Sequence, residues 1–215
     1  MSDTALSRAE MTVKVIAQTA VDNETYFCEL DAVVGDGDFG YSLARGFEIV
    51  LSDFNELEYD DAGGLLKKTA LVLTKRIGGT SGPIWGTAFL RAGATLSGNP
   101  DPSGADVIAA LRASIEGIKQ RGNTDLGDKT LLDALVPAVD ELEQALQEGA
   151  PDALQRAAVK ARESAEATKG MLAQRGRASY TGERSRDSVD AGAIGIAVML
   201  EAVSKAWQES ELERA

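Results

Sequence analysis

The chain of 215 residues is strongly acidic, with 22 lysines and arginines against 34 aspartates and glutamates and a formal net charge of −12, which argues against nucleic acid as a partner. It contains no histidine, so the most common general base is absent and any bound metal must be held by oxygen atoms. Its one cysteine, Cys28, cannot form an internal disulfide, and no apolar run resembles a signal peptide or a membrane span, so we expect a cytoplasmic protein with no membrane partner.

Apolar residues recur three and four positions apart along most of the chain, which is the spacing of amphipathic helices. Eight helices are expected, in chain order around residues 16–27, 43–54, 66–77, 85–92, 108–118, 135–146, 154–165 and 196–207. Ser103 with Asp106 has the pattern of an N-terminal capping box, and Gly122 suits a helix end. With 44% apolar residues and no linker-like stretch, the sequence predicts one all-α domain over residues 1–215.

The stretch VVGDGDFG, residues 33–40, fits two nucleotide-binding patterns, G-x-G-x-x-G and D-F-G. The first needs a preceding strand and the second an H-R-D loop, so an all-helical chain without histidine excludes both. What remains is Asp31, Asp36 and Asp38 among glycines that let the backbone bend. Converging carboxylates suit Mg²⁺, but an acidic turn in solvent that caps the following helix fits equally well. An EF-hand is excluded, because the twelfth position counted from Asp36 is Phe47 rather than glutamate.

Three further stretches have features of a nucleotide site. In GGTSGPIWG, residues 78–86, backbone amides and two hydroxyls precede a helix, an arrangement that receives phosphate. A simple turn between two helices, with no ligand, would have the same sequence pattern. In GDKTLLDALVPA, residues 127–138, Leu131 could cover a nucleobase or serve only in a helix cap and the core. RGRASYTGERSRDSVDAGA, residues 175–193, is the longest segment without helical period, and a long ordered loop in a compact domain is usually functional.

In this order the four stretches resemble the L subunit of dihydroxyacetone kinases, the nucleotide-binding domain also called the DAK2 or DhaL domain. The resemblance runs from about Leu30 to the last helix. It implies an eight-helix antiparallel up-and-down barrel that binds ADP or ATP at one end, with two Mg²⁺ ions held by Asp31, Asp36 and Asp38. It also implies that Arg177 is catalytic, and that the nucleotide is contacted by Phe39, Gly40, Tyr41, Ser42, Thr80, Ser81, Gly122, Leu131, Arg177, Asp190, Ala191 and Gly192.

The resemblance further implies a division of labour, in which a separate K subunit holds the ketose through a histidine and the L subunit supplies the phosphoryl group. A chain without histidine fits that division. Phe39 departs from the family, which usually has histidine there in phosphotransferase-linked members and often cysteine in ATP-dependent fused ones. The donor therefore stays open between ATP and a phosphocarrier of the phosphotransferase system, and the ketose between dihydroxyacetone and a four-carbon sugar such as erythrulose. The alternative function is a nucleotide-sensing scaffold that keeps the fold and acts by binding another protein.

Overall fold

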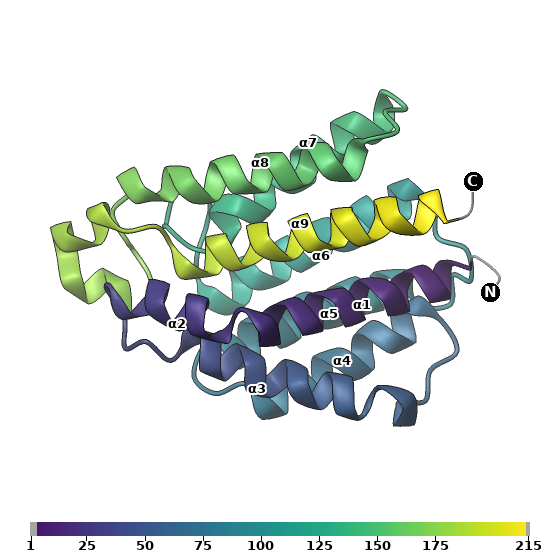
Figure 1. The fold of residues 1–215 in the computed structure, drawn as a ribbon, viewed down its shortest axis with the longest axis horizontal. Helices are drawn as coiled ribbons and strands as arrows, with labels where there is room; N and C mark the ends of the chain where they lie inside the picture. Colours follow the sequence, from purple (N-terminus) through teal and green to yellow (C-terminus); the bar gives the residue numbers. More distant parts are fainter. Residues whose placement is uncertain (1–3, 214–215) are drawn as a thin grey trace. The chain divides into compact units, whose positions relative to one another are not determined.

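The computed structural model describes residues 4–213, and within this range all regular structure is helical. The prediction of an all-α fold is confirmed (Figure 1). Over the described range there are nine α-helices: α1 (Ala5–Asp22), α2 (Glu24–Ala32), α3 (Phe39–Ser52), α4 (Ala62–Arg76), α5 (Ser81–Leu96), α6 (Gly104–Gly122), α7 (Leu132–Gln147), α8 (Ala153–Ala167) and α9 (Ala191–Leu212). Three 3₁₀ segments join them: the short η1 (Phe54–Glu56) and η2 (Thr168–Gly170), and the longer η3 (Arg177–Asp187).

The described residues form two compact units. The first unit contains residues 4–24 and 41–124, and the second contains residues 25–40 and 125–213. Most of α2 and the start of α3 therefore belong to the second unit together with α7, α8 and α9. The single domain over residues 1–215 and its barrel arrangement stay predictions.

The first unit is built on contacts of α4 with α1 and α5, and of α5 with α6. The fully buried Phe47 of α3 meets Trp85 and Phe89 of α5, with ring centroids 6.2 and 6.3 Å apart and the rings edge-on. Such edge-to-face pairs stabilise a core beyond the area that they bury. The predicted capping box at α6 is confirmed, because the Asp106 carboxylate accepts a 2.8 Å hydrogen bond from the Ser103 amide while the Ser103 hydroxyl accepts from the Asp106 amide.

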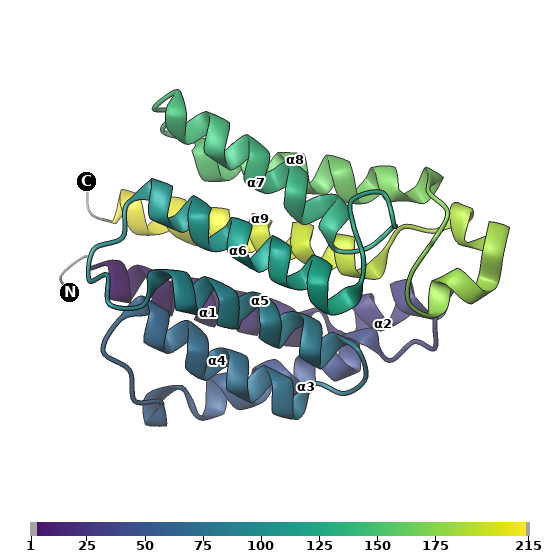
Figure 2. The ribbon, with the colours of Figure 1, turned by 180° about the vertical axis from the view of Figure 1, so that it is seen from behind.

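The second unit packs α7 against α8, α8 against α9 and α7 against α9, and α7 and α8 run side by side in both ribbon views (Figures 1 and 2). Small side chains let these three helices approach one another closely. The buried alanines of the second unit include Ala134, Ala138, Ala145, Ala157, Ala158, Ala161, Ala165, Ala193 and Ala197. Arg162 of α8 makes two hydrogen bonds of 2.8 and 2.7 Å to the carboxylate of Glu201 on α9. This three-helix scaffold holds the start of α9 and the chain that leads into it.

The helix pattern differs from the prediction in two places. The single helix expected around residues 16–27 is two helices, because Asn23 leaves helical geometry and its side-chain amide donates to the Thr19 carbonyl at 2.8 Å, which ends α1. The segment expected to lack helical period, residues 175–193, contains the 3₁₀ turns of η3, interrupted at Gly182, where φ is +58°. None of the helices in residues 4–213 is both long and apolar enough to cross a lipid bilayer.

Candidate functional site

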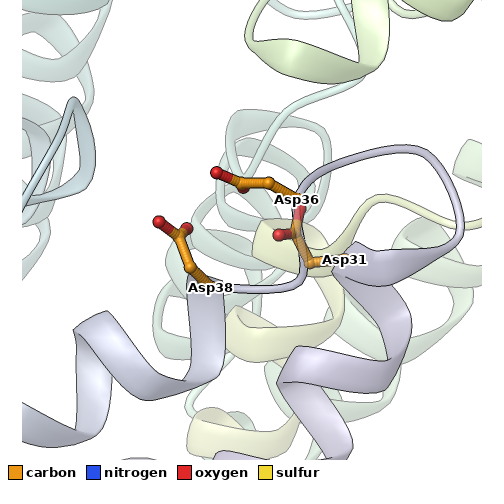
Figure 3. A group of neighbouring side chains, drawn as sticks. All are labelled: Asp31, Asp36 and Asp38. Carbon is orange, nitrogen blue, oxygen red and sulfur yellow. The ribbon is translucent and has the colours of Figure 1, made fainter.

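Asp31, Asp36 and Asp38 come together around the loop that joins α2 to α3 (Figure 3). Asp31 lies in the last turn of α2, Asp36 lies in the loop, and Asp38 directly precedes the first residue of α3. Each residue offers a carboxylate oxygen, and these three oxygens lie within 4.8 Å of one another. Among the described residues this is the one group of three or more acidic, cysteine or histidine side chains so arranged, and we call it the aspartate triad.

Two glycines allow the triad to form. The amides of Val34 and Gly35 donate to the backbone carbonyl of Asp31 at 3.2 and 2.6 Å, and the Gly37 amide donates to the Asp31 carboxylate at 2.8 Å. A Cβ atom at position 35 would lie 2.2 Å from Oδ1 of Asp31, and Gly37 has a φ of +75°. Larger residues are therefore excluded by contact at position 35 and strained at position 37.

The electrostatics of the triad are only partly balanced within the chain. Burial, and after it the negative charge of Asp36, raise the pKa of Asp38, while Arg177 opposes the rise. The guanidinium of Arg177 lies 2.7 Å from the Asp36 carboxylate, and the Arg177 side chain is 65% exposed. One guanidinium beside three carboxylates leaves a net negative charge, which a bound cation could neutralise. A donor set made only of oxygen atoms suits a hard divalent ion such as Mg²⁺. The residues present therefore fit the predicted metal site.

A second group of predicted residues meets at the start of α9. The Asp190 carboxylate caps this helix by accepting a 2.7 Å hydrogen bond from the Ala193 amide, and the Asp190 amide donates to the Thr168 hydroxyl at 2.8 Å. A Cβ at Gly192 would lie 3.2 Å from Cβ of Leu131, so the glycine lets this turn approach Leu131 closely. Burial raises the pKa of Asp190 to about 7. Leu131 and the turn of residues 190–192 thus form one continuous surface.

Two buried charged residues beside this group, Lys129 and Asp133, were not predicted from the sequence as site residues. The Lys129 ammonium donates to the backbone carbonyls of Met171, Ser185 and Ser188, and burial lowers its pKa. The Asp133 carboxylate accepts from the amides of Gly127 at 2.6 Å and Thr130 at 2.7 Å. Thr130 and Asp133 have the spacing of a capping box, and this pattern could have identified Asp133 from the sequence. Lys129 has a left-handed φ of +62°, which no sequence pattern indicated.

Phe39, the position at which the chain departs from the family pattern, is a packing residue. Its ring centroid lies 6.0 Å from that of the buried Phe27. On α9, a Cβ at Gly195 would meet the Phe39 ring at 3.7 Å, which is ordinary van der Waals contact. Phe39 therefore joins the start of α3 to α2 and α9 within the second unit, and Gly40, buried beside it, continues the helix.

The remaining predicted nucleotide residues lie in the first unit. Thr80 and Ser81 stand at the start of α5, where Thr80 is exposed and its hydroxyl makes no capping bond. Gly122 ends α6, and a Cβ there would lie 3.1 Å from Ile84, one turn into α5, so these two helix ends meet. Tyr41 is 55% exposed, with the Arg45 guanidinium 5.2 Å from its ring centroid, and Ser42 follows in α3. Their contact with nucleotide stays a prediction.

Comparison with known proteins points to one family. Residues 33–205 match the DAK2 domain. The chain is 35% identical over 186 residues to the ADP-binding subunit DhaL of the PEP-dependent dihydroxyacetone kinase of Escherichia coli strain K12, covering 86% of this chain and 89% of that subunit. It is 38% identical over 186 residues to the L-erythrulose kinase of Pectobacterium atrosepticum, covering 85% of this chain and 32% of that enzyme.

A solved structure shows the same fold. The dihydroxyacetone kinase from C. freundii in complex with AMP-PNP and Mg²⁺ superposes with a TM-score of 0.74 at 27% identity, over 95% of this chain and 35% of that one. The chain thus spans nearly all of the bacterial DhaL subunit but about a third of the two longer kinases. All three proteins are kinases or kinase subunits, as the resemblance seen in the sequence implied.

Proposed function

The chain belongs to the DAK2 domain family, and from this premise we propose that it is the nucleotide-binding, phosphoryl-transferring subunit of a kinase that acts on dihydroxyacetone or a related ketose. The observation that carries the proposal is the aspartate triad with the Arg177 guanidinium against it. Phosphoryl transfer needs mainly positioning and charge neutralisation, and a cluster of carboxylates with an arginine beside it is suited to both.

Asp31, Asp36 and Asp38 are the residues that would hold the metal, for which we propose two Mg²⁺ ions. When bound, the ions supply positive charge that offsets the charge of the phosphate oxygens. Arg177 presents a planar fork of N–H donors that matches phosphate oxygens, and its high exposure leaves it free to turn from Asp36 toward them. The chain itself provides no covalent nucleophile in this scheme, because the phosphoryl group passes directly to the ketose.

The nucleotide is ADP or ATP, and we assign it two kinds of contact. The start of α5, with its amides and the hydroxyls of Thr80 and Ser81, would receive the phosphates, since a helix N-terminus favours anions. The apolar surface of Leu131 and Gly192 would lie against the base. The contact set is completed by Phe39, Gly40, Tyr41, Ser42, Gly122, Asp190 and Ala191.

We propose that the ketose is held by a separate K subunit. The chain has no histidine with which to bind a ketose covalently, and its three clustered aspartates, once they hold the proposed metal, would not be available as a general base. The E. coli relative of similar length is named an ADP-binding subunit, which supports this arrangement. The ADP-binding subunit DhaL of Lactococcus lactis, 32% identical, is named as part of a PTS-dependent kinase, which favours a phosphotransferase-system phosphocarrier as the donor. Phe39 is used in packing and supports neither donor.

The test is a coupled kinase assay with and without the K subunit. Dihydroxyacetone and erythrulose are each offered as acceptor, and ATP and a phosphorylated phosphocarrier are each offered as donor. We expect transfer only when both subunits are present, and none with Asp36→Asn, while Asp60→Asn, at an exposed position in the first unit, keeps wild-type activity. Transfer by the chain alone at ordinary enzyme rates contradicts the two-subunit proposal. Tight binding of ADP without transfer to either ketose identifies a nucleotide-sensing scaffold instead.

A further inference from the structure

Arg177 is carried by a segment that needs to be held in place. We define the Arg177 segment as residues 171–188, which connect η2 to the approach of α9. Arg177 follows Gly176, whose φ is +65°, and its own side chain projects into solvent except for the contact with Asp36 described above. The position of its guanidinium therefore depends on the path of the backbone. An error of about 1 Å in the placement of a group that acts on the reacting phosphate can cost on the order of 10²-fold in rate.

Lys129 fastens both ends of this segment. It is 2% exposed, and its ammonium donates to the carbonyls of Met171 at 3.2 Å, Ser188 at 2.6 Å and Ser185. Met171 begins the segment and Ser185 and Ser188 end it, so one side chain closes the segment into a loop. A lysine ammonium has three donors, and all three are used here.

Neighbouring contacts support the same loop. The Gln174 amide donates to the Asp128 carbonyl at 3.0 Å, and the Arg175 guanidinium lies 3.3 Å from the Asp128 carboxylate. The buried Ser185 hydroxyl accepts from the Ala173 amide at 3.0 Å and donates to the Gly182 carbonyl at 2.8 Å. The turn before α7 therefore makes most of the contacts that hold the Arg177 segment, and the buried Lys129 makes three of them.

A buried ammonium is costly, so its presence at this position calls for an explanation. Replacing buried charges with apolar residues of similar volume is often neutral or stabilising, and stability alone does not favour a lysine. Its specific property here is that one atom with three donors can hold carbonyls from distant points of the chain in one geometry. Resting on the phosphoryl-transfer function proposed above, we propose that Lys129 is a positioning residue, which keeps the Arg177 segment closed so that Arg177 faces the aspartate triad.

The test uses Lys129→Met, which keeps the length of the side chain and removes all three donors. Lys169→Met, at an exposed position of η2, is the matched control. In the assay with the partner subunit, we expect Lys129→Met to lower kcat by on the order of 10² while the Kd for ADP with Mg²⁺ stays within about twofold. Lys169→Met should change neither quantity. By hydrogen exchange, amides of residues 172–187 should exchange at least about tenfold faster in Lys129→Met than in the control.

A double-mutant cycle with Arg177→Ala separates positioning from general damage. If Lys129 acts through Arg177, adding Lys129→Met to Arg177→Ala lowers kcat by less than about twofold. Full multiplication of the two losses, or unchanged exchange in the segment, overturns the proposal. Should Lys129→Met fail to fold, Lys129→Gln, which keeps two N–H donors on a neutral side chain, takes its place in the same cycle with a smaller loss expected. If the wild-type pair transfers no phosphate, the proposed function fails, and the exchange measurement still decides whether Lys129 closes the segment.

Discussion

Gly35 offers a way to disturb the aspartate triad without changing a carboxylate. In Gly35→Ala the new methyl group would lie 2.2 Å from Oδ1, 2.7 Å from Cγ and 2.8 Å from the backbone oxygen of Asp31. Contacts below 3.0 Å are essentially never made by real Cβ atoms. The two closest contacts are with the Asp31 side chain, which must therefore adopt a new position. The contact with the Asp31 backbone oxygen, which accepts from the Gly35 amide at 2.6 Å, also requires a small shift of the loop backbone.

The expected magnitudes differ for stability and for binding. Relieving the overlap requires a new rotamer of Asp31 and the loss of its 2.8 Å bond from the Gly37 amide, which should lower the free energy of unfolding by about 1–3 kcal/mol. The triad then offers two carboxylates in place of three. We expect the affinity for ADP in the presence of Mg²⁺ to fall at least tenfold, which corresponds to about 1.4 kcal/mol.

Isothermal titration calorimetry with ADP and Mg²⁺ measures the affinity, and urea denaturation measures the stability. Gly170→Ala is the control, because a Cβ there meets nothing within 4 Å, and it should bind ADP like the wild type. Wild-type affinity in Gly35→Ala, with the fold intact, would refute the argument that the Asp31 carboxylate is held in place for a metal.

Three further outcomes are expected. Arg177→Gln should lower turnover by on the order of 10³. It should also tighten Mg²⁺ binding to the nucleotide-free protein by up to about fivefold, because it removes a mostly exposed cation that competes for Asp36; looser Mg²⁺ binding would contradict this. The folded protein keeps a proton on Asp190 up to about pH 7, whereas the unfolded chain loses it near its ordinary pKa of 3.8. The free energy of unfolding should therefore fall as pH rises from about 4 to about 7, and urea titrations of Asp190→Asn, which stays neutral and can still cap α9, should show a shallower fall. Phe39→Ala should cost about 2 kcal/mol of stability in urea denaturation, whereas Tyr180→Ala, at a side chain 91% exposed, should change it by less than about 0.5 kcal/mol.

Sequence periodicity was sufficient for the helices with a clear apolar stripe and local caps. The start of α6 could be placed because Ser103 and Asp106 satisfy each other within one turn, which makes the signal independent of tertiary structure. The break at Asn23 was missed because the apolar spacing continues across it. The turns of η3 were missed because 3₁₀ helices are short and repeat every three residues, so no amphipathic stripe develops.

The candidate site was predictable to the extent that it is local in sequence. The three aspartates lie within eight residues, and the glycines among them indicated a bent loop. Lys129 was not predictable, since a lysine between an aspartate and a threonine looks like a solvent-facing residue. Its burial depends on carbonyls of Met171, Ser185 and Ser188, which come from a distant part of the chain.

The discontinuity of the second unit has a consequence for how the protein is made. Residues 25–40 are synthesised before the whole of residues 41–124, yet in the structure they belong to one compact unit with residues 125–213. At roughly 5–20 residues per second, Asp36 leaves the ribosome on the order of ten seconds before Arg177. During that interval all residues of the first unit become available for their own contacts. The triad has no arginine to offset its charge until Arg177 is synthesised. A nascent chain halted after residue 124 would hold every residue of the first unit and three aspartates without Arg177, so the proposed phosphoryl-transfer site can be completed only late in synthesis.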